Sequence, residues 1–170
     1  MNLPQTLNPG APAPESIQHL SFRVREARYA LPIELVREII EYGQITTVPM
    51  MPSFIHGVIN LRGNVVPVLD LAARFGFELT VPGKRTCIVI IELELDDQQQ
   101  RIGLVVDAVD AVLDIDSREV EPTPPFGAGI RTDFIAGMAR DERGFTLVLD
   151  VRRVLSLDDI LQLALAQQAG

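Results

Sequence analysis

Alternating apolar and polar residues predict that most of this chain folds into β-strands. Between residues 18 and 25, Leu20, Phe22 and Val24 alternate with polar residues, which is the pattern of a half-buried strand. Similar patterns predict strands at 28–33, 36–45, 57–61, 65–69, 85–95, 101–106, 109–115, 134–140 and 145–150. The stretch 88–91 is apolar at every position, so we expect that strand to be buried on both faces.

The stretch 57–71 predicts a β-hairpin. Two apolar runs flank Arg62-Gly63-Asn64, where Gly and Asn tolerate the positive φ of a tight turn. In the first run, alternation places Ile59 and Leu61 on the inward face. The outward face then carries Val58, Asn60 and Arg62. An Asn and an Arg beside a Val favour a contact surface, although a solvated strand with one extended Arg would give the same pattern. A further alternative is that Arg62 forms an internal ion pair, for example with Glu38, and serves stability.

The second half of the chain resembles the first. Residues 30–36 align with 103–109 at an offset of 73, and 54–57 and 68–70 align with 134–137 and 148–150 at an offset of 80. Two copies are too few for a solenoid, so the repeat predicts two small β modules of about five strands that close into barrels. The outward face of the second copy carries Met138, Arg140 and Glu142 and is more charged. This difference favours a specialised surface on the first copy, although drift between the copies would also produce it.

Composition narrows the possible functions. The chain has 170 residues, of which 47% are apolar, and a formal net charge of −8. The apolar content suffices for a sizeable core, and the negative charge argues against binding nucleic acid or anionic lipid. We find no apolar run of membrane-spanning length and no signal peptide, so we expect a cytoplasmic protein. The single cysteine, Cys87, lies in an apolar run and is predicted to be a buried, inert thiol.

Candidate catalytic and metal-binding residues are sparse. His19 and His56 are far apart, no Cys-His cluster has zinc-ligand spacing, and no phosphate-binding glycine loop is present. Asp70 and Asp150 occupy matched positions of the repeat. They could form a catalytic pair, but each follows a strand and is better explained as the cap of a helical turn. We therefore expect no cofactor and no metal.

The segment Gly57-Val58-Ile59-Asn60-Leu61-Arg62-Gly63-Asn64-Val65-Val66-Pro67-Val68-Leu69-Asp70-Leu71, followed by Arg74-Phe75-Gly76, resembles the central signature of the CheW family of chemotaxis coupling proteins. Further matching segments fall in the right order at 31–39, 48–52, 103–107 and 147–150, so the resemblance covers roughly residues 18 to 157. One departure is Ala72, which stands where the family usually has a basic residue. Any contact made by that basic side chain is therefore in doubt here.

The resemblance implies a mostly β fold of two SH3-like, five-stranded barrel modules around a shared core, with short helices. The domain boundaries that we expect are a disordered N-terminal tail at 1–16, interleaved barrel modules at 17–157, and a C-terminal helix and tail at 158–170. The resemblance also implies a non-enzymatic adaptor that joins the cytoplasmic hairpin tip of chemoreceptors to the regulatory domain of a CheA-type histidine kinase. It places the adaptor in the cytoplasm, recruited to membrane-bound receptor arrays. The receptor-binding groove would be formed by Val36, Glu38, Gly57, Val58, Asn60 and Arg62.

Three alternatives remain open at the level of sequence. The adaptor could serve a chemosensory system that controls pili, twitching or another output, because the motifs do not encode the output. The chain could be a coupling domain whose relatives carry a receiver domain, although only about 15 residues follow the repeat. A small β-barrel enzyme or ligand-binding domain is the alternative from a different class.

Overall fold

The computed structural model describes residues 16–95, 97–123 and 134–155, and these residues form an almost entirely β structure. The ten strands are β1 (Ser16–Val24), β2 (Ala27–Pro32), β3 (Val36–Glu41), β4 (Ile55–Leu61), β5 (Asn64–Asp70), β6 (Cys87–Leu95), β7 (Gln98–Val106), β8 (Ala108–Asp116), β9 (Ile135–Asp141) and β10 (Gly144–Leu149). Two single-turn helices, α1 (Leu71–Arg74) and α2 (Val151–Val154), follow β5 and β10. Two 3₁₀ turns, η2 (Ile33–Leu35) and η3 (Ser117–Glu119), follow β2 and β8.

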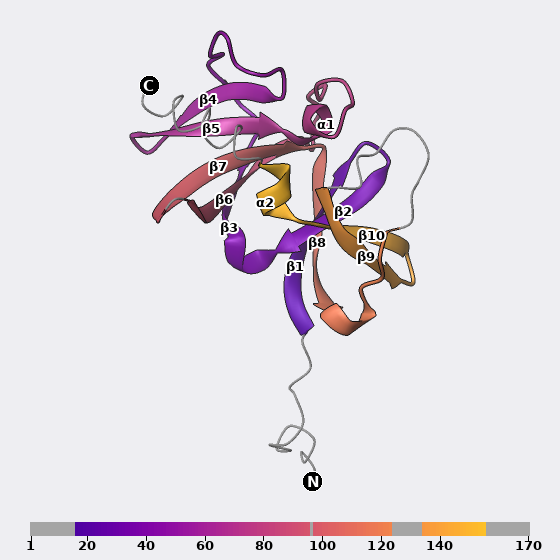
Figure 1. The fold of residues 1–170 in the computed structure, drawn as a ribbon. Coiled ribbons are helices and arrows are strands. Elements are labelled where there is room, and N and C mark those ends of the chain that lie inside the picture. Colours follow the sequence, from indigo (N-terminus) through magenta and orange to yellow (C-terminus); the bar gives the residue numbers. More distant parts are fainter. Residues whose placement is uncertain (1–15, 96, 124–133, 156–170) are drawn as a thin grey trace.

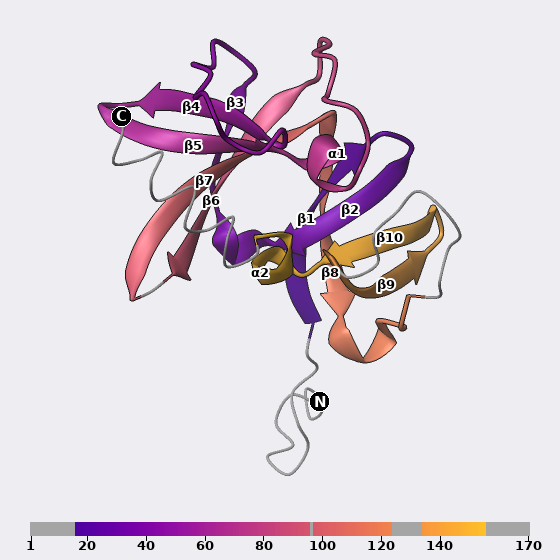
Figure 2. The same ribbon diagram turned by 45° about the horizontal axis from the view of Figure 1, so that its top comes forward.

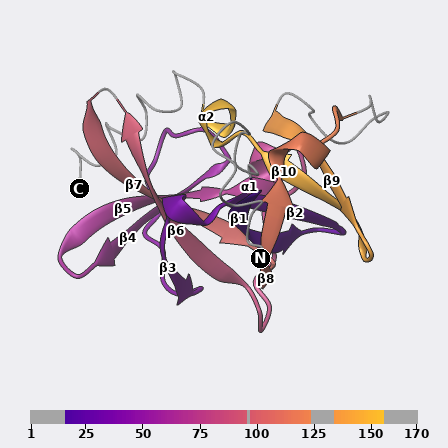
Figure 3. The ribbon, with the colours of Figure 1, turned by 90° about the horizontal axis from the view of Figure 1, so that it is seen from below.

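The strands form two five-stranded sheets that share one plan. The first has the order β3-β6-β7-β5-β4 and is called barrel 1 below, and the second has the order β8-β1-β2-β10-β9 and is called barrel 2. Each strand of one sheet takes the place of the strand five numbers away in the other sheet: β3 corresponds to β8, and β6 corresponds to β1. Each barrel therefore takes two strands from one half of the sequence and three from the other. Neither copy of the sequence repeat corresponds to one whole barrel. Figures 2 and 3 show the two barrels side by side.

In each barrel a short bridge joins one outer strand of the sheet to the loop that follows the other outer strand. In barrel 1 the N–H of Thr46 donates to the carbonyl of Val58, and the N–H of Val58 donates back, both at 2.8 Å. In barrel 2 Glu121 and Met138 exchange the same pair of bonds at 2.9 and 2.8 Å. These bonds pair backbone groups that an open sheet edge would leave free.

A central core lies between the two barrels and holds them together. It contains an aromatic chain in which the Tyr29 ring lies 6.2 Å from Phe22 and 5.0 Å from Phe75, and Phe75 lies 5.9 Å from Phe134. Strand β6 is buried on both faces, as predicted, because Val89 and Ile91 enter the central core while alternate residues Ile88 and Ile90 fill barrel 1. The mostly β fold with two SH3-like barrel modules and short helices is confirmed.

The structure confirms some of the predictions about single residues and contradicts others. The helical turn after β5 is present, and the Asp70 carboxylate accepts from the N–H of Ala73 at 3.2 Å as the predicted cap. Met138, predicted to lie on an outward face, is buried, because its side chain belongs to the central core. Cys87 is half-buried, and burial raises the pKa of its thiol. The predicted tail at 1–16, apart from Ser16, and the helix at 158–170 lie outside the described residues.

Candidate functional site

The β4–β5 hairpin ends in a two-residue turn that is built by Arg62 and Gly63. Both residues have positive φ, 51° and 86°, as a type I′ hairpin turn requires. The Asn60 side-chain oxygen accepts a hydrogen bond from the N–H of Gly63 at 2.9 Å. The predicted assignment of positive φ to Asn64 is wrong, because the turn begins one residue earlier and Asn64 is the first residue of β5. The turn therefore presents the Arg62 side chain at the tip of the hairpin.

Arg62 forms a bidentate ion pair with Glu38 of β3. One guanidinium nitrogen of Arg62 contacts Glu38 Oε1, and the other donates to Oε2 at 3.3 Å. The hydrogen bond from Arg62 lowers the pKa of the Glu38 carboxyl, and the same bond raises the pKa of Arg62. Because β3 and β4 are the outer strands of the barrel 1 sheet, this pair reaches across the seam where the barrel closes.

A second group of charges lies beside this pair. Glu92 of β6 accepts from Arg37 at 2.8 Å and from Arg101 at 3.0 Å, and these hydrogen bonds lower the pKa of its carboxyl. The register of β3 against β6 shifts between Val36 and Glu38, which makes Arg37 the extra residue of a β-bulge. A bulge redirects side chains locally, so neighbouring residues of β3 supply an arginine to Glu92 and a carboxylate to Arg62.

The remaining predicted site residues have mixed exposure. Val36 is half-buried and packs against the central core, and Val58 is half-buried next to the barrel seam. Asn60 is exposed, and its side chain stabilises the turn.

Gly57 is buried under the loop that closes barrel 1. Its φ is 155°, and a Cβ at this position would collide with the carbonyl oxygen of Thr46. The structure thus joins Glu38 to Arg62 directly and gives Gly57 and Asn60 supporting positions.

A groove of about 560 Å³ runs between the two barrels. Barrel 1 contributes Glu92 and Leu93 of β6, and barrel 2 contributes Val148 and Leu149 of β10. Leu35, the residue before β3, also lines it, so the groove borders the strand that carries Val36 and Glu38. Its lining combines apolar and charged side chains, as a protein-binding groove does.

Sequence reasoning missed a polar network behind the hairpin. The Tyr42 hydroxyl lies 3.1 Å from His56 Nε2, and His56 Nδ1 lies 3.6 Å from Asp70 Oδ2. The backbone N–H and the hydroxyl of Thr80 each donate to Asp70 at 3.0 Å. Burial raises the pKa of Asp70, but the nearby His56 imidazole and the hydrogen bonds from Thr80 and Ala73 outweigh it and lower the pKa. Tyr42 carries no sequence signal for this network, because only barrel closure brings it to His56.

The described residues contain no cluster of three or more His, Cys, Asp or Glu side chains that could hold a metal ion. Within the same part of the chain, no helix is long and apolar enough to cross a membrane. The candidate site comprises the ion pairs of Glu38 and Glu92 and the groove between the barrels.

Comparison with known proteins gives consistent matches. The model of the CheW-like domain family matches residues 18–159. Chemotaxis protein CheW of Klebsiella aerogenes is 29% identical over 143 residues, covering 84% of each chain, and probable chemotaxis protein CheW of Rhizobium etli is 34% identical over 130 residues, covering 76% of this chain and 81% of the relative. Protein FrzA of Myxococcus xanthus is 32% identical over 119 residues, covering 70% and 71%.

A solved structure agrees with these sequence matches. The crystal structure of the scaffolding protein TtCheW from Thermoanaerobacter tengcongensis superimposes with a TM-score of 0.73 at 34% identity, covering 89% of this chain and 94% of that one. The strand plan, the central hairpin and these matches together show that this chain belongs to the CheW-like domain family.

Proposed function

We propose that this chain is a non-enzymatic adaptor that couples chemoreceptors to a CheA-type histidine kinase in bacterial chemosensory signalling. The observation that carries the proposal is an exposed arginine, Arg62, held at a hairpin tip by Glu38 in a protein of the CheW-like family. A fixed, exposed guanidinium is suited to recognition, because little side-chain freedom remains to be lost on binding.

The receptor would bind beside the groove between the barrels. The cytoplasmic hairpin tip of a chemoreceptor is helical and offers carboxylates and helix-end carbonyls, which match the donors of Arg62. In this proposal Glu38 and Arg62 make polar contacts, and Val36 and Val58 supply apolar area at the rim. Gly57 and Asn60 contribute by shaping the backbone of the hairpin.

The adaptor would act by geometry. The family resemblance implies that the regulatory domain of the kinase is itself SH3-like. It would dock on another face of the adaptor. Because both barrels share the central core, a receptor bound on one face and a kinase bound on another are held at a fixed separation. A shift of the receptor tip would then bias the kinase through packed contacts. The protein would thereby be recruited from the cytoplasm to receptor arrays.

The test is a binding assay with both proposed partners. The full chain is mixed with a receptor-tip fragment and the kinase regulatory domain, singly and together, and complexes are separated by size-exclusion chromatography. We expect both binary complexes and a ternary one. Failure to bind either partner, together with a ligand found in a screen of nucleotides, metals and metabolites, would favour the β-barrel ligand-binding or enzyme alternative.

The output of the pathway is a separate question. The matched relatives include proteins named for chemotaxis and Protein FrzA, so similarity does not single out flagellar, pilus or other outputs. Deleting the gene and scoring swimming and surface motility would separate these outputs.

A further inference from the structure

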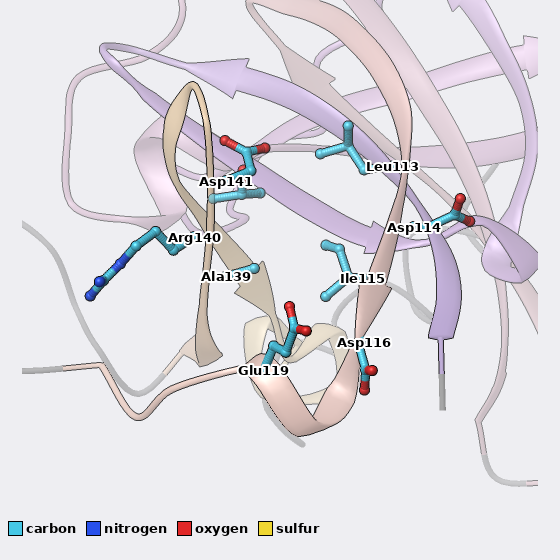
Figure 4. Close-up of a pocket in the computed structure, with 9 residues that line it drawn as sticks. Leu113, Asp114, Ile115, Asp116, Glu119, Ala139, Arg140 and Asp141 are labelled. Carbon is cyan, nitrogen blue, oxygen red and sulfur yellow. The ribbon is translucent and has the colours of Figure 1, made fainter. Parts of the chain in front are cut away.

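Barrel 2 contains a small cavity between β8 and the β9–β10 hairpin (Figure 4). Its volume is about 120 Å³, which is room for several water molecules. The residues that line it are Leu113, Asp114, Ile115, Asp116, Glu119, Ala139, Arg140, Asp141 and Thr146. The proposed adaptor function does not use this cavity.

The corresponding interior of barrel 1 is filled by larger apolar side chains. The offset of 80 that relates β4–β5 to β9–β10 pairs each residue of one hairpin with a residue of the other. The three relevant pairs, with the barrel 1 residue first, are Ile59 and Ala139, Leu61 and Asp141, and Val66 and Thr146. Ile59 and Val66 are buried in the barrel 1 core, with Leu61 packed against them. At these three positions barrel 2 has smaller or more polar side chains than barrel 1, which leaves a cavity that is lined in part by polar groups.

Thr146 gives this space a polar wall. Its side chain is 1% exposed, and among the described residues its hydroxyl has no hydrogen-bond partner. It lies opposite Ala139 in the β9–β10 register and lines the cavity. A buried hydroxyl without a partner is unfavourable, so this group calls for an occupant that can hydrogen-bond to it.

The charge around the cavity is negative. Figure 4 shows Glu119 and Asp141 directed toward the space between β8 and β9, with Arg140 directed away from it. Asp141 is compensated by Arg28 at 3.3 Å, and Arg140 pairs with Glu121 at 3.2 Å. Within the described part of the chain, no cationic side chain pairs with Glu119. Asp116, which also lines the cavity, pairs with Arg118 at 2.8 Å, whereas Glu119 and Asp114 have no cationic partner among the described residues. Of these two carboxylates, Glu119 is the one directed into the space in Figure 4.

We propose that this cavity binds the guanidinium or ammonium group of an arginine or lysine side chain. Glu119 would accept charge-assisted hydrogen bonds from the cation, and the Thr146 oxygen would accept one more. Leu113 and Ile115 would contact the methylene stem. The cavity is below the usual size of a pocket for a drug-sized ligand, about 300 Å³ or more, which fits the entry of one side-chain end.

The test is an NMR titration of the full chain with N-acetyl-arginine amide and N-acetyl-lysine amide as probes. N-acetyl-citrulline amide, which is neutral and nearly the same shape as the arginine probe, is the control ligand. We expect saturable shifts at Ala139 and Thr146 with a dissociation constant on the order of 1 mM for at least one cationic probe, and none for citrulline. A peptide with one central arginine distinguishes the sources: tighter binding than the amide indicates a protein partner, and equal binding indicates a free amine.

Three variants locate the binding. Ala139→Ile restores the barrel 1 residue and should abolish binding, while Thr146→Val and Glu119→Gln should each weaken it at least threefold. Glu142→Gln removes an exposed charge in the β9–β10 turn, and because Glu142 does not line the cavity, this variant should leave binding unchanged. If Ala139→Ile fails to fold, the other two variants still decide. The proposal is overturned if no cationic probe binds, if citrulline binds equally, or if Glu142→Gln has the same effect as Glu119→Gln.

Discussion

At the scale of single residues, the Glu38–Arg62 ion pair has two candidate roles. The two roles predict different effects of a substitution on stability and on binding. The pair could stabilise the seam of barrel 1, since it joins the two outer strands of the sheet. It could instead hold Arg62 ready for a partner. Arg62 remains 65% exposed, and an ion pair so accessible to water adds little to stability. We therefore propose that the pair serves recognition.

Replacing Arg62 by Ala should weaken receptor binding by roughly 5- to 100-fold, the range of an interface hot spot, with little change in melting temperature. Isothermal titration with a receptor-tip fragment and thermal unfolding measure the two effects on one sample. Arg140→Ala is the matched control, because Arg140 is similarly exposed and pairs with Glu121 beside the seam of barrel 2.

The charge reversal Glu38→Arg with Arg62→Glu separates the two purposes further. It restores an ion pair across the seam but exchanges the charges shown to a partner. We expect normal stability and lost receptor binding. Retained affinity together with a lowered melting temperature in Arg62→Ala would contradict the assignment to recognition.

Asp70 gives a prediction about pH. Its folded-state pKa is lowered, so its contribution to stability is fully present above its unfolded pKa, about 4, and is lost as pH falls through the folded pKa. Asp70→Asn should thus lower the free energy of unfolding at pH 7, and the difference from wild type should shrink toward pH 3. Urea unfolding at the two pH values measures this.

Asp150→Asn is the control for Asp70. Asp150 caps α2 at the matched position, but it is partly exposed and accepts one backbone hydrogen bond, from Arg153 at 3.3 Å. Asp150→Asn should lower the free energy of unfolding by less than Asp70→Asn. Asp70→Ala would leave buried hydrogen-bond donors unpaired, at a cost of about 1–3 kcal/mol. Equal losses for the two positions would show that the buried network around Asp70 adds nothing.

At the scale of elements, the hairpin depends on the loop that closes barrel 1. The chain from β3 to β4 crosses Gly57 closely enough that Thr46 and Val58 exchange two backbone hydrogen bonds. This contact fixes the hairpin relative to β3 and therefore places Arg62 within reach of Glu38. A structural glycine thus supports the proposed binding surface from beneath.

Gly57→Ala should lower the free energy of unfolding by about 3 kcal/mol or more, because the new Cβ would meet the Thr46 carbonyl and the backbone conformation favours glycine. Chemical denaturation measures the loss. Gly43→Ala in the same connection is the control, since a Cβ there meets its nearest atom at 4.0 Å, and we expect a change within about 0.5 kcal/mol. A stable Gly57→Ala variant would show that the closing loop adapts.

At the scale of the whole molecule, exchange of strands makes the two barrels one folding unit. Barrel 1 needs β6 and β7 from the second half of the chain, and barrel 2 needs β1 and β2 from the first half. The central core then joins both sheets through Tyr29, Phe75 and Phe134. Neither half of the sequence can complete a barrel by itself.

Thermal unfolding should accordingly show one transition by calorimetry and by circular dichroism. A chain cut between β5 and β6, as fragments 1–84 and 85–170, should give two unfolded pieces that regain native spectra only when mixed. Two resolved transitions, or a fragment that folds alone, would show that the barrels are independent.

The sequence by itself determined the class of fold and the position of most strands. Alternation in β1, the doubly apolar run in β6 and the aspartates that cap α1 and α2 are local signals, because side-chain period and capping depend on residues close in sequence. The predicted half-burial of β1 is wrong, because His19 and Ser21 on its other face are buried as well. The repeat likewise revealed two related modules, and the hairpin signature identified Arg62 as a candidate contact.

Only the tertiary structure decided how those parts combine. The exchange of strands between barrels, the Glu38–Arg62 contact and the network of Tyr42, His56 and Asp70 join residues that lie on different strands. The cavity beside Thr146 likewise depends on β8 and the β9–β10 hairpin standing apart. Such arrangements follow from the balance of packing across the whole molecule, and periodicity within one strand carries no record of which distant strand will lie beside it.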